Sequence, residues 1–185
     1  MVTLPLSALL VLIFGWLAWV MPFFLMKRNQ AKAEKIDKRA RWGIFLLFVA
    51  FSIVWQPYFW EKSFPTWRLP VSIAFFALAS ALSWTAARTL GRQWRIDAGL
   101  NADHQLITSG PYRLVRHPIY TSMLCLVWAV GILLIRLPWL ALATVLAIVG
   151  TEIRVHVEDG LLQSRFGKQF EDFQKSVPAY LPWKI

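Results

Sequence analysis

The sequence predicts an all-α, polytopic membrane protein with five transmembrane helices, a cytoplasmic cap loop and a C-terminal amphipathic helix. Three observations lead to this fold class: 57% of the 185 residues are hydrophobic, they gather in long uncharged blocks, and basic residues concentrate between alternate blocks. A soluble domain of this length could not hide so much apolar surface in one core. The blocks approach or reach the length of a membrane-spanning helix, about 20 residues.

Five uncharged blocks give the predicted spans in chain order. They are residues 4–26, 42–60, 69–87 and 118–135, and a block that begins at Leu137 and meets its first charge at Glu152. Only Arg136 and the turn at Pro138 separate the last two, a connection short enough for an antiparallel helical hairpin. The first block is interpreted as a retained anchor, because no basic residue precedes it and it exceeds the apolar region of a signal peptide.

The distribution of basic residues predicts the orientation. Residues 27–41, residues 88–117 and the tail after Ile153 together hold 17 of the 20 Lys and Arg residues. With five spans these regions share one side, which the positive-inside rule places in the cytoplasm, with the N-terminus outside a cell or inner membrane. The net charge of +10 is interpreted as topology and attraction to anionic membrane lipids rather than nucleic-acid binding. A single cysteine, Cys125, excludes an intrachain disulfide.

Two segments on that side have distinct predictions. Residues 27–41, KRNQAKAEKIDKRAR, are expected to extend the first or second span as helix, and a solvated charged loop is favoured there over a lipid or partner patch. Residues 88–117 are long for a connection and too apolar for disorder. They are predicted to fold into a cap over the cytoplasmic ends of the helices. Because all three histidines lie in this segment and the tail, any active site is expected on the cytoplasmic face.

The tail shows helical periodicity. Apolar residues recur at steps of three, four and seven, at Val155, Leu162, Phe166, Phe170, Phe173 and Val177. The last span is therefore expected to continue as an amphipathic helix, interrupted at Gly167 and ended by Pro178 and Pro182. Such a helix would lie at the membrane interface or close over the cap.

The segment GPYRLVRHPIY, residues 110–120, places two arginines, a histidine and two tyrosines at the start of an uncharged block. Polarity so close to a membrane span is expensive and marks a functional site. Proline favours the first turn of a helix, so Pro118 places His117 at or near an N-cap. The free amides there, with Arg116 beside them, are expected to hold an anion at the membrane surface.

Other side chains leave alternatives open. Arg154 and Glu158 share a helix face, as an anion-holding arginine fixed by a carboxylate or, favoured from spacing alone, as an ordinary ion pair. A zinc site built from His104, His117 and His156 is disfavoured because no close ligand pair occurs, so no metal is expected. The glycines never form G-x-G, which excludes the dinucleotide fingerprint and the P-loop.

Two segments, HQLITSGPYRLVRHPIY at 104–120 and RVHVEDGLLQSRFGKQFEDFQKSVPAYLP at 154–182, resemble the isoprenylcysteine carboxyl methyltransferase family and related phospholipid methyltransferases. The resemblance implies a membrane enzyme that uses S-adenosylmethionine outside a Rossmann fold. It implies that Arg154 orients the acceptor and that Glu158 supports the cofactor or the arginine. The implied cofactor-lining residues are His104, Gln105, Leu106, Tyr112, Arg116, His117, Tyr120 and Glu158.

The chain departs from this family at four positions. Ser122 replaces a usual glycine, Asp159 a second glutamate, and Phe170 and Phe173 two usual tyrosines. The division that the resemblance implies is three N-terminal transmembrane helices at 1–87 and a methyltransferase core at 88–185.

The expected reaction is carboxyl O-methylation of an isoprenylcysteine-like or other lipophilic acceptor that enters from the bilayer. One alternative is N-methylation of a phospholipid headgroup, for which Glu158 or His156 would serve as base. Another is a non-catalytic membrane scaffold or transporter that keeps the fold.

Overall fold

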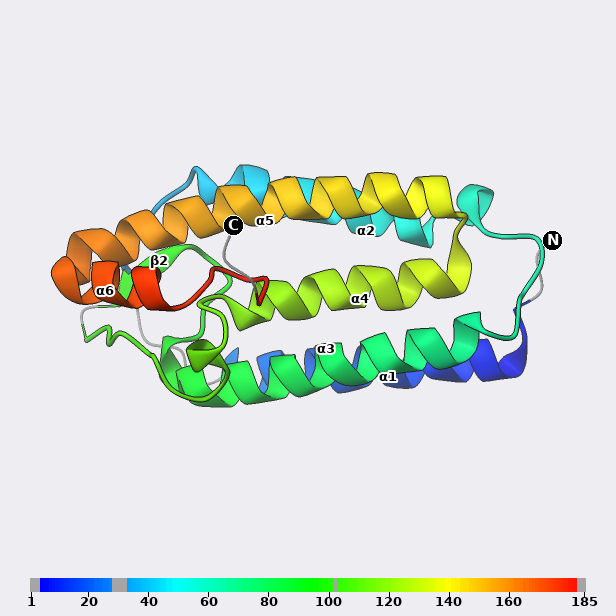
Figure 1. The fold of residues 1–185 in the computed structure, drawn as a ribbon, viewed down its shortest axis with the longest axis horizontal. Coiled ribbons are helices and arrows are strands. Elements are labelled where there is room, and N and C mark those ends of the chain that lie inside the picture. Colours follow the sequence, from blue (N-terminus) through cyan, green and yellow to red (C-terminus); the bar gives the residue numbers. More distant parts are fainter. Residues whose placement is uncertain (1–3, 28–32, 102, 183–185) are drawn as a thin grey trace.

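The computed structural model describes residues 4–27, 33–101 and 103–182, and within them five long helices run side by side (Figure 1). Their bounds are α1 Leu6–Lys27, α2 Ala40–Trp55, α3 Arg68–Leu90, α4 Pro118–Leu134 and α5 Leu137–Phe166. Shorter elements join them: β1 Ala33–Ile36, β2 Gly99–Asn101, α6 Lys168–Ser176, and the 3₁₀ turns η1 Pro57–Phe59, η2 Gly91–Gln93 and η3 Gly110–Arg113. The predicted all-helical architecture is therefore confirmed, apart from a small two-stranded ribbon.

Three helices in the described part of the chain are long and apolar enough to cross a membrane. They cover Leu6–Leu25, Arg68–Gln93 and Leu137–Phe166. The other two long helices, α2 and α4, have 16 and 17 residues. At 1.5 Å per residue they reach about 24 and 26 Å, short of a hydrocarbon core of about 30 Å. Length and composition thus support three of the five predicted spans.

The core lies around α4, most of whose side chains are buried. α4 packs against α3 and α5, while α1 packs on α3 and α2 packs on α5. Gly43 and Gly150 let α2 and α5 approach closely, because a Cβ at Gly43 would lie 2.5 Å from the Gly150 carbonyl oxygen. Small residues commonly permit such contact between membrane helices, where burial from water no longer drives association.

The connection between α4 and α5 is the predicted antiparallel hairpin, since α4 ends at Leu134 and α5 begins at Leu137. Arg68, which is 4% exposed, stabilises this turn. Its Nη1 donates to the Ile135 carbonyl oxygen at 3.1 Å, and its Nη2 lies 3.4 Å from Glu61 Oε2. The pairing satisfies both a buried charge and a carbonyl at the end of α4.

The expected helical extension over residues 27–41 is wrong at 33–36, which form strand β1. β1 pairs antiparallel with β2, and the register joins Ala33 to Asn101 and Ile36 to Gly99. Pairing with a distant segment overrides the helical preference of this alanine-containing charged run. α1 continues to Lys27 and α2 begins at Ala40, whereas residues 28–32 lie outside the described part of the chain.

The tail follows the predicted pattern. α5 runs unbroken to Phe166, and the chain turns at Gly167, whose φ of 51° suits a residue without a Cβ. α6 then folds back beside the end of α5 (Figure 1) and ends at Ser176, before Pro178. Its Phe170 is 1% exposed, so the apolar stripe is packed against the protein.

Candidate active site

A cavity of about 850 Å³ lies at the end of the bundle that carries α6 and β2, and it continues between α1 and α2. Its size falls in the range of small-molecule and cofactor sites. The structure brings every predicted site residue into its lining: His104, Gln105, Leu106, Tyr112, Arg116, His117, Tyr120, Arg154 and Glu158. Segments separated by 50 residues of sequence thus share one wall.

Arg154, on α5, is the most enclosed cation of the cavity lining at 4% exposure. Its stem lies over Gly43 of α2, where a Cβ would approach the Arg154 Cγ to 2.5 Å. The guanidinium Nε donates to the Tyr120 hydroxyl, and Nη2 donates to the Ile96 carbonyl at 2.8 Å and to Glu158 Oε1 at 2.9 Å. Nη1 is buried and has no hydrogen-bond partner among the described residues. One charged donor therefore remains for a ligand.

Glu158 lies one helical turn after Arg154 and holds it in place. The ion pair forms as the spacing predicts, but its side chains are 5% and 24% exposed, so it is not an ordinary solvated helix pair. The Tyr120 hydroxyl donates to Glu158 Oε1 while it accepts from Arg154 Nε. This closed arrangement fixes the guanidinium in direction as well as position.

Asp159 carries the second half of the polar cluster. Its Oδ1 lies 2.8 Å from His117 Nε2, and its Oδ2 accepts from Arg116 Nη2 at 2.8 Å. The resemblance matched Asp159 to the second carboxylate of the family's acidic pair but gave it no role or partner of its own. The structure shows that this carboxylate, rather than an external anion, pairs with both cations at the start of α4.

His117 is held as an imidazolium. Burial opposes its charge, but the carboxylates of Asp159 and Glu158 outweigh burial and raise the pKa of His117 to about 9. Nδ1 lies 3.5 Å from Glu158 Oε2, so both ring nitrogens face carboxylates. His117 is the N-cap of α4 and Pro118 its first residue, as predicted.

The two backbone amides just before α4 are occupied by the tail of the chain, whereas an anion at the amides of its first turn stays a prediction. The amides of Arg116 and His117 donate to the carbonyls of Pro178 and Ala179 at 2.9 and 2.8 Å. The amide of Tyr120 donates to the His117 carbonyl. The tail after α6 therefore accepts hydrogen bonds from these amides and is held beside the cavity. The sequence could not predict this role, because only backbone groups take part.

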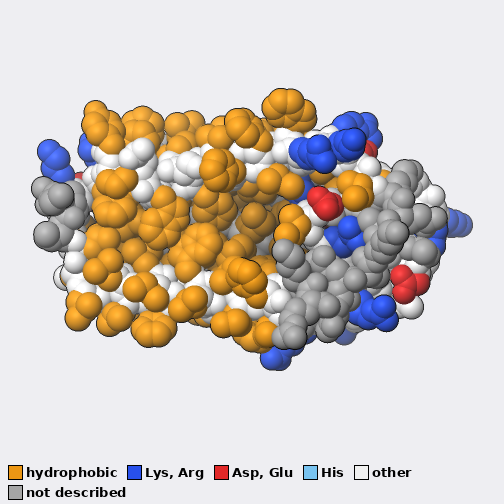
Figure 2. Space-filling view, turned by 180° about the vertical axis from the view of Figure 1, so that it is seen from behind, with side chains coloured by type: hydrophobic (Ala, Val, Ile, Leu, Met, Phe, Trp, Pro, Cys, Tyr) orange, Lys and Arg blue, Asp and Glu red, His pale blue; other side chains and the backbone are white. Residues whose placement is uncertain are grey.

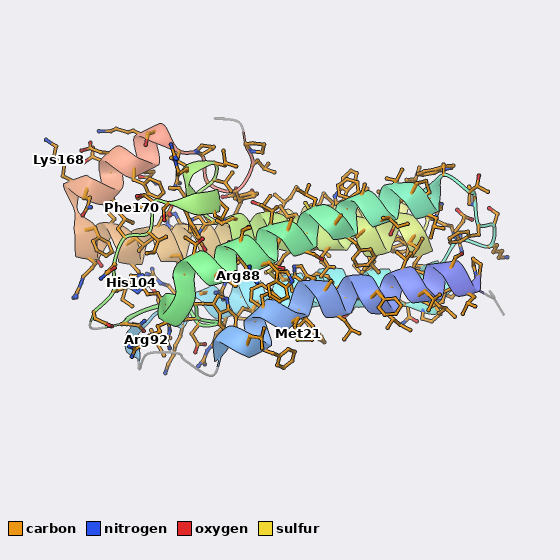
Figure 3. All side chains as sticks on the ribbon, turned by 90° about the horizontal axis from the view of Figure 1, so that it is seen from below. Met21, Arg88, Arg92, His104, Lys168 and Phe170 are labelled. Atoms are coloured by element: carbon orange, nitrogen blue, oxygen red, sulfur yellow. The ribbon has the colours of Figure 1, made fainter. Side chains whose placement is uncertain are left out.

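The end of the cavity that α6 and residues 93–107 line is called the cap end. Burial lowers the pKa of His104, and the Arg165 guanidinium lowers it further, so His104 is neutral near pH 7. Its Nδ1 is buried without a hydrogen-bond partner among the residues described. Phe170 and Phe173 of α6 complete this end, and Figure 3 shows His104 and Phe170 at the same end of the bundle. His156, by contrast, is exposed and lies outside the lining.

Buried polar atoms of the lining that have no hydrogen-bond partner within the described ranges include Trp16 Nε1, His104 Nδ1, Arg116 Nε and Arg154 Nη1. Because buried polar groups are normally satisfied, they indicate a polar ligand. Over the same ranges, no group of three or more His, Cys, Asp or Glu side chains could hold a metal ion. The unpaired atoms fit an organic ligand with anionic and heterocyclic parts, as S-adenosylmethionine has.

The fold and the cavity define a helical membrane protein with a buried ion-pair cluster beside an apolar chamber. The chain belongs to the phospholipid methyltransferase family, whose model matches residues 67–169. It is 28% identical over 121 residues to protein-S-isoprenylcysteine O-methyltransferase of Tribolium castaneum, covering 63% of this chain and 42% of that protein. It is 30% identical over 122 residues to protein-S-isoprenylcysteine O-methyltransferase B of Arabidopsis thaliana, covering 63% and 60%.

A third relative has a different name. Over 143 residues the chain is 29% identical to the cobalt-zinc-cadmium resistance protein CzcN of Cupriavidus metallidurans, covering 76% of this chain and 62% of that protein. The chain thus spans between 42% and 62% of the length of these three relatives.

Proposed function

We propose that this chain is an integral membrane methyltransferase that uses S-adenosylmethionine to methylate the carboxylate of an isoprenylcysteine-like or other lipophilic acceptor. Family membership supports methyl transfer, and two relatives carry the name of an isoprenylcysteine O-methyltransferase. The observation that carries the acceptor class is Arg154, which keeps one buried charged donor unpaired beside the apolar part of the cavity.

The cofactor would be held at the cap end of the cavity. His104, Gln105, Leu106 and Tyr112 would line it on one side, with Arg116, His117, Tyr120 and Glu158 on the other. When bound, S-adenosylmethionine supplies an electrophilic methyl group on a sulfonium. Phe170 and Phe173 would exclude water from this end, which strengthens every charge interaction inside.

Arg154 and Glu158 are the proposed catalytic residues. A carboxylate acceptor is already ionised near pH 7, so it needs no base; it needs proximity, alignment and loss of its water shell. The unpaired Nη1 of Arg154 would hold one carboxylate oxygen and leave the other free to react. Glu158 keeps the guanidinium in this orientation through its contact with Nη2.

We propose five membrane spans with the cavity's polar end in the cytoplasm and the N-terminus outside. α2 and α4 run beside the three longer helices (Figure 1), and tilt or local thinning of the bilayer would accommodate their shorter length. The cytoplasmic side then carries most of the basic residues. Residues 1–87 would supply three spans, and residues 88–185 the methyltransferase core.

The acceptor would enter sideways from the bilayer. Figure 2 shows the face made by α1 and α2, which hydrophobic side chains cover for most of its length while charged side chains gather at one end. Phe24 of α1 and Ile44 and Phe48 of α2 are exposed and also line the cavity. A lipophilic acceptor could pass between them without leaving an apolar surrounding.

The direct test is to incubate membranes holding the protein with methyl-tritiated S-adenosylmethionine and to separate protein, lipid and small-molecule fractions. Base-labile label released as methanol supports an ester. Base-stable label on a headgroup amine would contradict the carboxylate acceptor and favour phospholipid N-methylation. No transfer, together with no heat on titration of the purified protein with the cofactor, would favour a scaffold or transporter.

Arg154→Ala separates the proposed roles. It should lower turnover by about a hundredfold, as loss of a charge-stabilising donor does, while cofactor affinity is retained. Arg116→Ala and His117→Ala should instead weaken cofactor binding, measured by calorimetry. His156→Ala is the matched control, because His156 is exposed and outside the cavity lining. Intact turnover in Arg154→Ala would exclude its proposed role.

A further inference from the structure

The cavity extends well beyond the ion-pair cluster. From Arg154 and Tyr120 it continues between α1 and α2, and its lining there consists of apolar and aromatic side chains. The farthest lining residues along these helices are Trp16 on α1 and Trp55, the last residue of α2. We call this part of the cavity, from Ile44 to Trp16 and Trp55, the tail arm.

Aromatic rings contact one another at the far end of the tail arm. The centroid of the Trp16 ring lies 5.9 Å from that of Phe51 and 6.1 Å from that of Trp55. These contacts bridge α1 and α2, which otherwise pack on different partners, α3 and α5. Large rings in edge and tilted contact resist displacement better than flexible aliphatic side chains.

The α1 side of this cluster is fixed from a second direction. The Trp16 ring contacts Trp19 at 5.6 Å, and the Trp19 indole Nε1 donates to Ser122 Oγ on α4 at 3.1 Å. Ser122 is fully buried. It stands where the resembling family usually has glycine, so this hydrogen bond depends on a residue particular to this chain. It anchors Trp19 and limits how far Trp16 can move.

The length of the tail arm follows from helix geometry. Gly43 of α2 contacts the stem of Arg154 and marks the level of the polar cluster. Phe51 and Trp55 follow eight and twelve positions later, about 12 and 18 Å along the helix. Half of a hydrocarbon core of about 30 Å is about 15 Å, the length of one acyl chain in one leaflet.

We propose that Trp16, Phe51 and Trp55 form a stop that limits the acceptor's hydrocarbon tail to about the length of one leaflet. The occupant of the tail arm is thus the tail of the same acceptor whose carboxylate meets Arg154, because one continuous cavity joins the two ends. A longer tail must displace an aromatic ring of the cluster or turn out of the tail arm into the lipid. This inference rests on the proposed function for the position of the acceptor's head.

The test uses N-acetylcysteines that carry S-octyl, S-dodecyl, S-hexadecyl or S-eicosyl chains, so that only tail length changes. Affinity is measured by displacement of a tritiated S-dodecyl probe from purified protein, and turnover is measured in parallel. For the unchanged protein both should be highest with the dodecyl compound and fall at least about tenfold by the eicosyl compound. Trp16→Ala should move the optimum to hexadecyl or longer.

Two further variants keep the inference open to refutation. Phe51→Trp enlarges one ring of the stop and should move the optimum toward octyl, which tests the same idea if Trp16→Ala fails to fold. Trp128→Ala removes an indole from a lipid-exposed site outside the cavity and should leave the profile unchanged. Superimposable profiles for the folded Trp16→Ala or Phe51→Trp protein and the unchanged protein would overturn the stop. If affinity falls for long tails but no methyl group is transferred, the stop is supported and the proposed reaction is refuted.

Discussion

Replacing His117 with glutamine should remove most of the pH dependence of stability between about pH 6.5 and pH 9. His117 is 7% exposed and lies between the carboxylates of Asp159 and Glu158, which raise its pKa to about 9. Arg116, from the same loop, and Tyr120, from the first turn of α4, complete its charged and titratable surroundings. A neutral glutamine keeps a donor for Asp159 but cannot carry the charge.

The sign and size of the effect follow from the raised pKa. A histidine whose pKa rises from an ordinary 6.5 to about 9 on folding binds its proton more tightly in the folded state. Its stabilisation is complete below about pH 6.5 and is lost as pH rises through about 9. At about 1.4 kcal/mol for each tenfold change in proton affinity, the loss is on the order of 3 kcal/mol.

The assay is urea unfolding in mixed micelles at several pH values, followed by tryptophan fluorescence. The unchanged protein should lose stability steadily from pH 6.5 to 9, whereas His117→Gln should be less stable at pH 6.5 and nearly flat above it. His156→Gln serves as the control because His156 is exposed. Equal slopes for the unchanged protein and His117→Gln would show that His117 is not held as an imidazolium.

Substitutions at three other positions, with Gly160→Ala as a control, test the packing that supports the site. Gly43→Ala forces a Cβ to within 2.5 Å of the Gly150 carbonyl and of Arg154, and should cost about 1–3 kcal/mol in urea unfolding and lower turnover. Gly160→Ala, where a Cβ meets nothing within 4 Å, should be neutral or slightly stabilising. Asp159→Asn leaves two buried cations with less negative charge and should cost about 3 kcal/mol in the same assay, with Asp159→Glu less harmful. Phe170→Ala opens the cap end of the cavity and should weaken S-adenosylmethionine binding about tenfold by calorimetry, with acceptor affinity unchanged.

The apolar blocks located the long helices because an uncharged run depends only on local composition. The block at 42–60 overshot α2, which ends at Trp55, since the proline at 57 restricts the preceding residue and starts a 3₁₀ turn. Strand β1 was missed because its partner lies more than 60 positions away, and no local pattern reveals such pairing.

The candidate site could be predicted where the residues nearby in the sequence define a residue's role. Pro118 identified the start of α4, and the four-residue spacing identified the Arg154–Glu158 pair. That pair is buried by α2 and by the segment around Ile96. Its spacing alone therefore predicted an ordinary exposed ion pair. The role of Asp159 depends on where α4 begins in space, and the contacts of the tail involve backbone carbonyls that carry no sequence signal.

The charge balance of the cluster favours a carboxylate over an amine as the acceptor. Arg116, His117 and Arg154 contribute three positive charges when His117 is protonated, while Glu158 and Asp159 contribute two negative charges. A bound carboxylate would lower this surplus of positive charge, whereas an ammonium head would raise it. An amine would also have to lose a proton before it reacts, and both carboxylates that could accept it are already paired with cations. The same pairing that holds Arg154 rigid therefore makes Glu158 and Asp159 poor bases for N-methylation.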